Sequence, residues 1–120
     1  MKIAVTSKGT DLNAELDPRF GRTKNFIIVD TETLDFEVKE NSQNLNLPQG
    51  AGIQAGKTVA ATGVEAVITG NCGPKAFSLL EAANIRVITG VNGPIKDAIE
   101  KLKAGELKSA GGPNVDGHWV

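Results

Sequence analysis

One eight-residue pattern occurs twice in this chain, twenty residues apart, and it restricts the fold more than any other feature. Residues 67–74 read VITGNCGP and residues 87–94 read VITGVNGP. Each copy is typical of a short β-branched strand, a glycine turn and a proline at the first helical position, where the missing N–H would have had no partner. The sequence therefore predicts two strand–turn–helix units, with each helix beginning at the carboxyl end of its strand.

The amino ends of both predicted helices are candidate anion sites. The first N–H groups of a helix have no partner within it, and the helix dipole places partial positive charge at the same end. Two such ends side by side would form a seat for an anion. The alternative is an ordinary strand-to-helix turn without a ligand, and for either copy taken alone it is the simpler interpretation.

The composition indicates one aliphatic domain without a basic excess. The chain has 120 residues, 40% of them hydrophobic, with four Phe, one Trp and no Tyr. A second domain would leave neither half enough core. Thirteen basic and fourteen acidic residues give a net charge of −1. This balance argues against general binding of nucleic acid or of anionic membranes, although it leaves room for a local basic patch.

No targeting or membrane segment is predicted. The first five residues enter a strand pattern directly, unlike a signal peptide, and no apolar run approaches the ~20 residues of a membrane span. The single cysteine, Cys72, excludes an intramolecular disulfide, and we expect a cytoplasmic protein. Cys72 and the single histidine, His118, are too few for a zinc site made by this chain alone.

The remaining elements follow from hydrophobic periodicity. We expect strands over residues 2–6, 25–31, 33–40, 65–70 and 85–90, and helices over residues 50–62, 75–83 and 95–103. Strands that alternate with helices predict a parallel arrangement with right-handed crossovers, and the hairpin of residues 25–40 adds an antiparallel edge. The prediction is an α/β domain over residues 1–107, with a mixed sheet covered by helices on both faces. Residues 108–120, which include His118 and Trp119, are expected to be a flexible tail.

The connection over residues 7–24 is long for a compact domain, which makes it a candidate functional loop. It contains four basic residues, Lys8, Arg19, Arg22 and Lys24, around Phe20. Arginine side chains and backbone N–H groups favour oxyanions and other multiply charged anions. The alternative is that these side chains are solvated loop charges without a ligand.

Three enzyme-like motifs are incomplete. Residues 51–58, AGIQAGKT, end like a phosphate-binding loop but lack its first glycine and do not follow a strand pattern. Asp11, Glu15 and Asp17 could act as acid–base groups only in a geometry that the sequence does not supply. Cys72 lies beside a predicted helix amino end, which lowers the pKa of a thiol. It has no CxxC partner, so it is either an incidental small residue or a contact to a metal or sulfide cluster.

Several short motifs together resemble a known family. They are MKIAV at residues 1–5, DPRFGR at residues 17–22, GAGI at residues 50–53 and the TGxxGP turn at residues 69–74. Their order and spacing are similar to those of the dinitrogenase iron–molybdenum cofactor-binding family, which includes nitrogenase accessory proteins and small stand-alone relatives. The likeness covers roughly residues 1–107.

The resemblance implies a ribonuclease H-like fold, a three-layer α/β/α arrangement around a five-stranded mixed sheet, without nuclease activity. It also implies non-catalytic binding of an anionic, molybdenum-containing metal–sulfur cluster, of a molybdenum–copper or an iron–molybdenum type. Matched by position, the residues that would bind it are Arg19, Phe20, Arg22, Gly50, Gly52, Asn71, Cys72 and Gly73. Many relatives have histidines just before the GAG segment, whereas residues 44–49 here have none. This difference favours non-covalent binding and leaves Cys72 as the candidate metal ligand.

The function expected first is storage or delivery of such a cluster, with a cluster donor or acceptor protein as partner and a monomer or weak dimer as the state of the chain. A small transferase or hydrolase that uses Cys72 is a second hypothesis, and it lacks a positioned base. A metal-free regulatory or interaction module is a third. Of the two copies of the repeated turn, the one at residues 70–74 matches the family motif, so the other is expected to shape the sheet edge.

Overall fold

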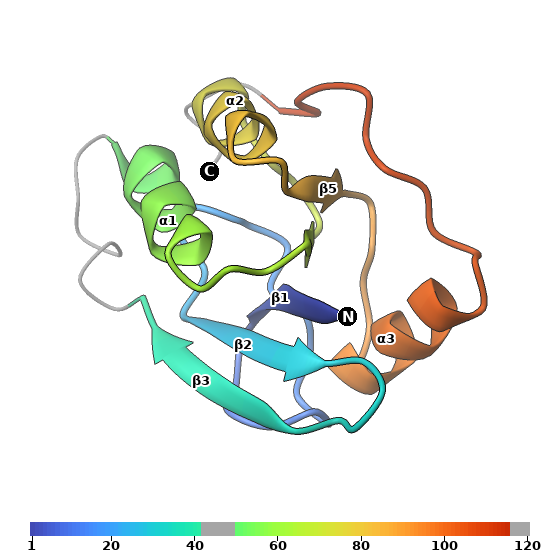
Figure 1. The fold of residues 1–120 in the computed structure, drawn as a ribbon. Helices are drawn as coiled ribbons and strands as arrows, with labels where there is room; N and C mark the ends of the chain where they lie inside the picture. Colours follow the sequence, from blue (N-terminus) through green and yellow to red (C-terminus); the bar gives the residue numbers. More distant parts are fainter. Residues whose placement is uncertain (42–49, 116–120) are drawn as a thin grey trace.

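The computed structural model describes residues 1–41 and 50–115, and this part of the chain forms a mixed sheet with three helices (Figure 1). The strands are β1 (Lys2–Ser7), β2 (Asn25–Asp30), β3 (Phe36–Glu40), β4 (Ala66–Ile68) and β5 (Arg86–Ile88). The helices are α1 (Ala51–Ala60), α2 (Pro74–Ala82) and α3 (Ile95–Lys103). The predicted α/β class and five-stranded mixed sheet are confirmed. None of the helices in the described ranges is long and apolar enough to cross a membrane.

The central strand β1 organises the sheet, whose order is β3-β2-β1-β4-β5. β1 pairs with β4 in parallel, and β4 pairs with β5 in parallel, as the crossover pattern predicts. On its other side β1 pairs with β2 antiparallel, and β2 pairs with β3 as a hairpin. The carboxyl ends of β1, β4 and β5 therefore meet at one edge of the sheet, where ligands of open α/β sheets bind.

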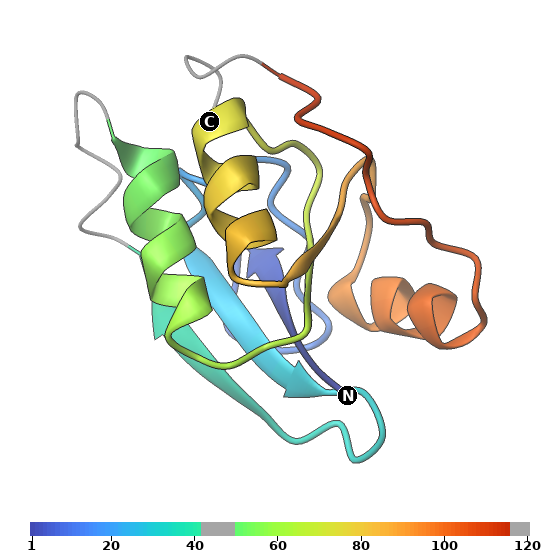
Figure 2. The same cartoon turned by 45° about the horizontal axis from the view of Figure 1, so that its top comes forward.

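Strand alternation divides the core into two layers. Ala4, Phe26 and Val67 face α1 and α2 within one hydrophobic cluster. Ile3 and Ile27 belong to a second cluster that includes the buried side of α3. Because neighbouring residues of a strand point to opposite faces, each strand supplies both clusters. The result is the expected three-layer arrangement, with α1 and α2 side by side on one face and α3 on the other (Figure 2).

The hairpin turn corrects one predicted boundary. The second strand of the hairpin begins at Phe36 rather than at residue 33. Asp30 Oδ1 accepts the backbone N–H groups of Glu32 and Thr33 at 2.8 and 3.2 Å, and Leu34 has a positive φ of 65°. These contacts form a tight turn instead of a strand, and they lower the pKa of the Asp30 carboxyl.

The described part of the expected tail, residues 108–115, makes hydrogen bonds to the domain. Ala110 N–H donates to Val87 O at 2.7 Å, and Asn114 N–H donates to Cys72 O at 3.1 Å. Ala110 also packs against the cluster beneath α1 and α2, and Leu107 packs against the α3 cluster. The chain is therefore bonded to the domain as far as Asn114, by contacts that its composition does not reveal. His118 and Trp119 lie outside the described residues, as do residues 42–49.

Candidate functional site

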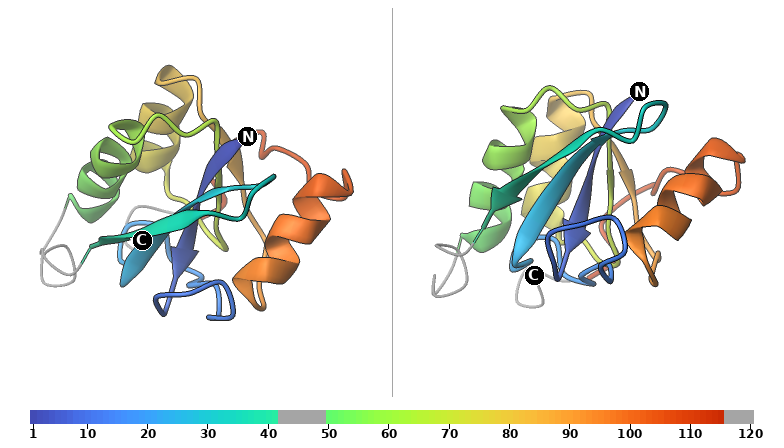
Figure 3. Two further views of the ribbon diagram at one scale, coloured as in Figure 1. Left: turned by 60° about the horizontal axis from the view of Figure 1, so that its bottom comes forward. Right: turned by 90° about the horizontal axis from the view of Figure 1, so that it is seen from below.

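The loop between β1 and β2 lies at the same end of the molecule as the amino ends of α1 and α2 (Figure 3). Glycines allow the close approach of these segments. A Cβ on Gly21 would lie 2.9 Å from Gly52 N, and a Cβ on Gly70 would lie 2.7 Å from Pro18 Cα. Neither distance is tolerated by an alanine without a shift of backbone. The loop is therefore in direct backbone contact with the start of α1 and with the turn after β4.

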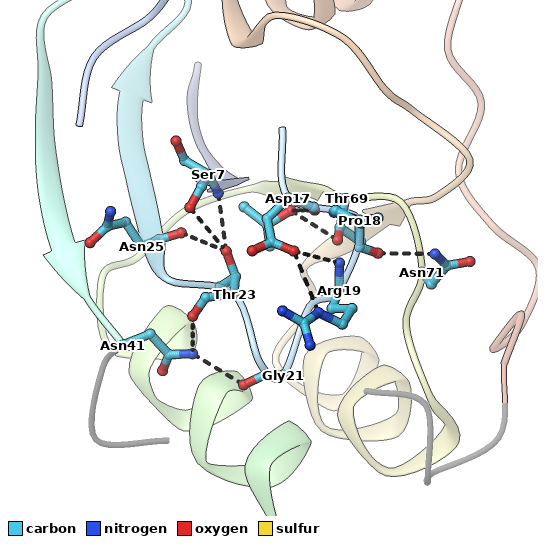
Figure 4. A network of polar contacts seen from close by, with 11 residues as sticks. Ser7, Asp17, Pro18, Arg19, Gly21, Thr23, Asn25, Asn41, Thr69 and Asn71 are labelled. Atoms are coloured by element: carbon cyan, nitrogen blue, oxygen red, sulfur yellow. Dashed lines mark hydrogen bonds and ion pairs between the residues drawn. The ribbon is translucent and has the colours of Figure 1, made fainter. Parts of the chain in front are cut away.

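A buried hydroxyl pair fixes the loop to the ends of two strands. Thr6 Oγ1 donates to the backbone oxygen of Asp17 at 2.6 Å and lies 3.0 Å from Thr69 Oγ1. Both threonines are fully buried. Phe20 N–H donates to the backbone oxygen of Asn71 at 3.1 Å, which joins the loop to the turn after β4. Figure 4 shows the neighbouring contacts of Asn71 with Pro18 and of Asp17 with Arg19.

A second set of polar contacts fixes the exit of the loop. Thr23 Oγ1 accepts the Ser7 N–H at 3.1 Å and donates to the Asn25 backbone oxygen at 2.9 Å. The Asn41 side-chain amide donates to the backbone oxygens of Gly21 and Thr23 at 3.1 and 2.9 Å (Figure 4). Satisfied buried polar groups of this kind hold a loop in one conformation. The long loop is thus a fixed part of the domain.

The basic residues of this loop gather around one cavity. Its volume is about 430 Å³, and it is lined by Lys8, Asp17, Pro18, Arg19, Arg22 and Lys24. Arg19 is tied to the neighbouring carboxylate, because its N–H donates to Asp17 Oδ1 at 3.0 Å and its Nε lies 3.8 Å from the same oxygen. The Arg19 side chain remains 46% exposed. The predicted constellation of four cations is therefore present as a single surface feature, which we call the basic cavity.

The amino ends of α1 and α2 flank this loop without side-chain caps. Gly50 precedes α1 with a left-handed φ of 82°, and Gly73 precedes α2 with an extended backbone. Pro74 occupies the first position of α2, as predicted. Within the described ranges, no hydrogen-bond partner is found for the N–H groups of Gly52 or Lys75. Both ends therefore keep the donors and the dipole charge that attract an anion.

The second copy of the repeated turn does not form such a site. Ile95 N–H donates to Ala14 O and Lys96 N–H donates to Leu12 O, each at 2.9 Å. The first donors of α3 are thus satisfied by the long loop. Pro94 is the N-cap of α3 rather than its first residue, which corrects the prediction for this copy. The expectation that this copy shapes the sheet edge agrees with its pairing to Glu15 in the loop.

The burial of Cys72 contradicts the sequence-based prediction that the pKa of its thiol is lowered. Its side chain is 0% exposed and belongs to the core cluster with Phe77 and Leu80. Burial raises the pKa of the thiol to about 12, because desolvation of the thiolate outweighs the nearby helix dipole. The sulfur lies 3.7 Å from the backbone oxygen of Gly73. The prediction used position along the chain and could not include the packing of the side chain.

The eight residues expected to bind a ligand separate into three groups. Arg19 and Arg22 line the basic cavity. Gly50, Gly52, Asn71 and Gly73 form the adjoining helix ends and turn, where Asn71 Nδ2 donates to the Pro18 backbone oxygen at 3.0 Å. The side chains of Phe20 and Cys72 are buried in the core.

Phe20, which the family resemblance names among the binding residues, has a fully buried side chain. Its ring packs on Phe26 with a centroid distance of 5.5 Å, so the side chain anchors the loop. Lys8 and Lys24, whose charge and loop position are evident from the sequence, line the basic cavity together with Arg19 and Arg22. In the described part of the chain, no group of three His, Cys, Asp or Glu side chains is placed to hold a metal ion.

A family model and several solved structures are similar to this chain. The family model described as dinitrogenase iron–molybdenum cofactor matches residues 1–105. The apo form of the orange protein from Desulfovibrio gigas is similar, with a TM-score of 0.92 and 39% sequence identity, over 95% of this chain and 96% of that one. A NifB-like protein of the DUF35 family from Thermotoga has a TM-score of 0.77 and 34% identity, over 90% of this chain and 91% of that one.

A curated relative supports the same grouping. An uncharacterized protein of Methanocaldococcus jannaschii is 34% identical over 110 residues, which is 90% of each chain. The family match and these relatives cover nearly the whole domain, including the long loop and both helix ends.

Proposed function

The chain belongs to the dinitrogenase iron–molybdenum cofactor family, and from this premise we propose that it binds, stores or delivers an anionic molybdenum-containing metal–sulfur cluster without catalysing a reaction. The cluster is cargo, with copper or iron as the second metal. The family assignment supports a cofactor-binding or carrier role in general. The ribonuclease H-like class is proposed with it, on the strand order β3-β2-β1-β4-β5 and the antiparallel β2.

The observation that carries this proposal is the basic cavity beside two uncapped helix ends. Lys8, Arg19, Arg22 and Lys24 surround one space of about 430 Å³. Charged donors and helix amino ends recognise multiply charged anions through hydrogen bonds, without covalent ligation. This arrangement suits a thiometallate whose sulfides accept hydrogen bonds. The side chains that a protein-ligated metal would need are not grouped among the described residues.

The enzyme hypothesis depends on Cys72 as the nucleophile, and the burial of this residue argues against that role. A Cys-dependent transferase or hydrolase needs an exposed thiolate. Cys72 is fully buried and its pKa is raised to about 12. A metal-free interaction module is the remaining alternative. The cavity lining favours an anion instead, because four basic residues face one carboxylate, Asp17, and leave a net positive charge there.

The direct test is titration of the purified chain with tetrathiomolybdate, alone and together with Cu(I) or Fe(II), followed by visible absorption and metal analysis after gel filtration. We expect a stoichiometric coloured complex. A chain that remains colourless and metal-free under all three conditions would contradict the proposal and favour the interaction module.

The two arginines that line the basic cavity should contribute directly to thiometallate binding. Replacing Arg19 and Arg22 together by alanine should weaken thiometallate binding at least about tenfold, because hydrogen bonds from charged donors contribute about 1.5–3 kcal/mol each. The melting temperature should change little, since Arg19 is 46% exposed and Arg22 is partly exposed, and exposed ion pairs contribute little to stability. Binding is measured by competition or by isothermal calorimetry.

The matched control is Lys101→Ala with Lys103→Ala. These exposed residues lie in the last turn of α3, whose first turn meets the long loop, and their replacement removes the same amount of charge. We expect wild-type affinity from this control. Equal loss of affinity in both double variants would show that net charge, rather than the basic cavity, governs binding. A large loss of stability in the arginine variant would mean that the arginines are structural.

A further inference from the structure

Asn114 connects the C-terminal segment to the turn that precedes α2. Its Oδ1 accepts the Cys72 N–H at 2.8 Å, and its own N–H donates to the Cys72 backbone oxygen at 3.1 Å. Its Nδ2 donates to the Gly70 backbone oxygen at 3.2 Å and to Asn71 Oδ1 at 3.1 Å. In Figures 1 and 2 this segment runs from α3 past β5 to the amino end of α2. One side chain thus spans the whole turn.

These bonds continue into the long loop through Asn71. The Asn71 side chain accepts from Asn114 with its oxygen and donates to the Pro18 backbone oxygen with its nitrogen at 3.0 Å. Its backbone oxygen accepts the Phe20 N–H at 3.1 Å. The two bonds of the Asn71 amide fix its orientation, because each needs a different end of the amide group. A chain of hydrogen bonds, which we call the relay, therefore runs from Asn114 through Asn71 to residues 18–20, which include Arg19.

We infer that Asn114 is a positioning residue of the proposed anion site, holding the turn at residues 70–73 and, through Asn71, the loop that carries Arg19. This inference rests on the proposed function for the identity of the ligand and on the hydrogen bonds alone for the relay. Asn114 touches neither the basic cavity lining nor the charged groups themselves. It acts by fixing the backbone on which the cations and the α2 donors are placed.

The chemistry of the side chain provides two informative variants. Alanine removes both the acceptor for Cys72 N–H and the donors to Gly70 and Asn71. Aspartate keeps the acceptor beside the amino end of α2, where a carboxylate is favourable, and removes the donors. Aspartate at this position should therefore keep the bond from Cys72 N–H and lose the relay. Ser109→Ala is the control, because Ser109 is exposed in the same segment and no hydrogen bond of its side chain is found within the described residues.

The experiment has two readouts for Asn114→Ala, Asn114→Asp and Ser109→Ala. The first is the Kd for tetrathiomolybdate with Cu(I). The second is amide hydrogen exchange at Cys72 and Phe20, which needs no ligand. For Asn114→Ala we expect Kd to rise about threefold to tenfold and exchange at both amides to accelerate by a similar factor, since one net hydrogen bond is worth about that much. For Asn114→Asp we expect slow exchange to return at Cys72 while Phe20 exchange stays fast and binding stays weak.

The outcomes separate this inference from the proposed function. Wild-type Kd together with unchanged Phe20 exchange in Asn114→Ala would overturn the inference while leaving the proposed function intact. If the wild-type chain binds no thiometallate, the proposed function fails, and Phe20 exchange then decides the relay by itself. A merely structural Asn114 would predict that aspartate, by keeping the bond from Cys72 N–H, also recovers binding. Parallel recovery of stability and binding in Asn114→Asp would therefore also overturn the inference.

Discussion

The Cys72 thiol precedes the N-cap residue of α2 and meets two opposing influences. The helix end favours a thiolate, whereas burial in the cluster with Phe77 and Leu80 removes the water that a thiolate needs. Burial is the larger effect, because the pKa rises to about 12. Phe20 shows the same principle, since a residue inside a recognisable sequence motif serves as a core anchor. At this scale sequence position predicts proximity to the site, and packing decides exposure.

The raised pKa of Cys72 predicts a pH dependence of stability. In the unfolded chain the pKa of the thiol is near its ordinary value of 9.0, and in the folded chain burial raises this pKa to about 12. The folded state therefore gains stability from this residue fully below pH 9 and loses it as the pH rises toward 12. The stability difference between wild type and Cys72→Ala should shrink over this range, by at most about 1.4 kcal/mol per pH unit. Urea unfolding of both proteins at pH 8 and pH 10.5 measures it, and a constant difference would show that the thiol is solvated.

At the scale of elements, two copies of one turn sequence adopt different structures. Gly90 and Gly93 have positive φ values of 77° and 89°, whereas Gly73 is extended and precedes a proline at the first helical position. The sequence pattern predicts both strands and both helices, because their signals are local. The difference between the turns comes from distant partners. The backbone oxygens of Leu12 and Ala14 accept the first N–H groups of α3, whereas Asn114 bonds to the turn before α2.

The close contact at Gly70 predicts the result of a single substitution. Gly70→Ala should destabilise the fold by about 1–3 kcal/mol, because its Cβ would lie 2.7 Å from Pro18 Cα and the backbone of the loop must move. Chemical denaturation measures the loss, and the same displacement should weaken thiometallate binding. Gly111→Ala is the control, since its Cβ meets nothing within 4 Å and its φ is not positive. Equal stability of the two variants would mean that the loop yields without cost.

For the whole molecule, the net charge and the local charge have opposite signs. The chain carries −1 overall, yet four cations line the basic cavity. The composition correctly argues against a broadly basic surface, and it leaves the location of a local patch open. The patch arises because the fold returns residues 8 and 24 to the same edge of the sheet. That closure depends on buried partners, such as Thr23 with Ser7 and Asn25, whose pairing no local sequence signal specifies.

This separation of local from net charge predicts how binding responds to salt. Raising NaCl from 50 to 500 mM shortens the Debye length from about 14 to about 4 Å, so attraction beyond direct contact is screened. Thiometallate affinity of the wild type should fall steeply, because an anion at the basic cavity interacts with all four cations. The fall should be smaller for the Arg19→Ala, Arg22→Ala variant, which keeps only Lys8 and Lys24 there. The Lys101→Ala, Lys103→Ala variant has the same net charge as the arginine variant and should keep the wild-type salt response. Titrations at both salt concentrations decide between the two sources of charge, and identical slopes in all three proteins would show that the anion binds elsewhere.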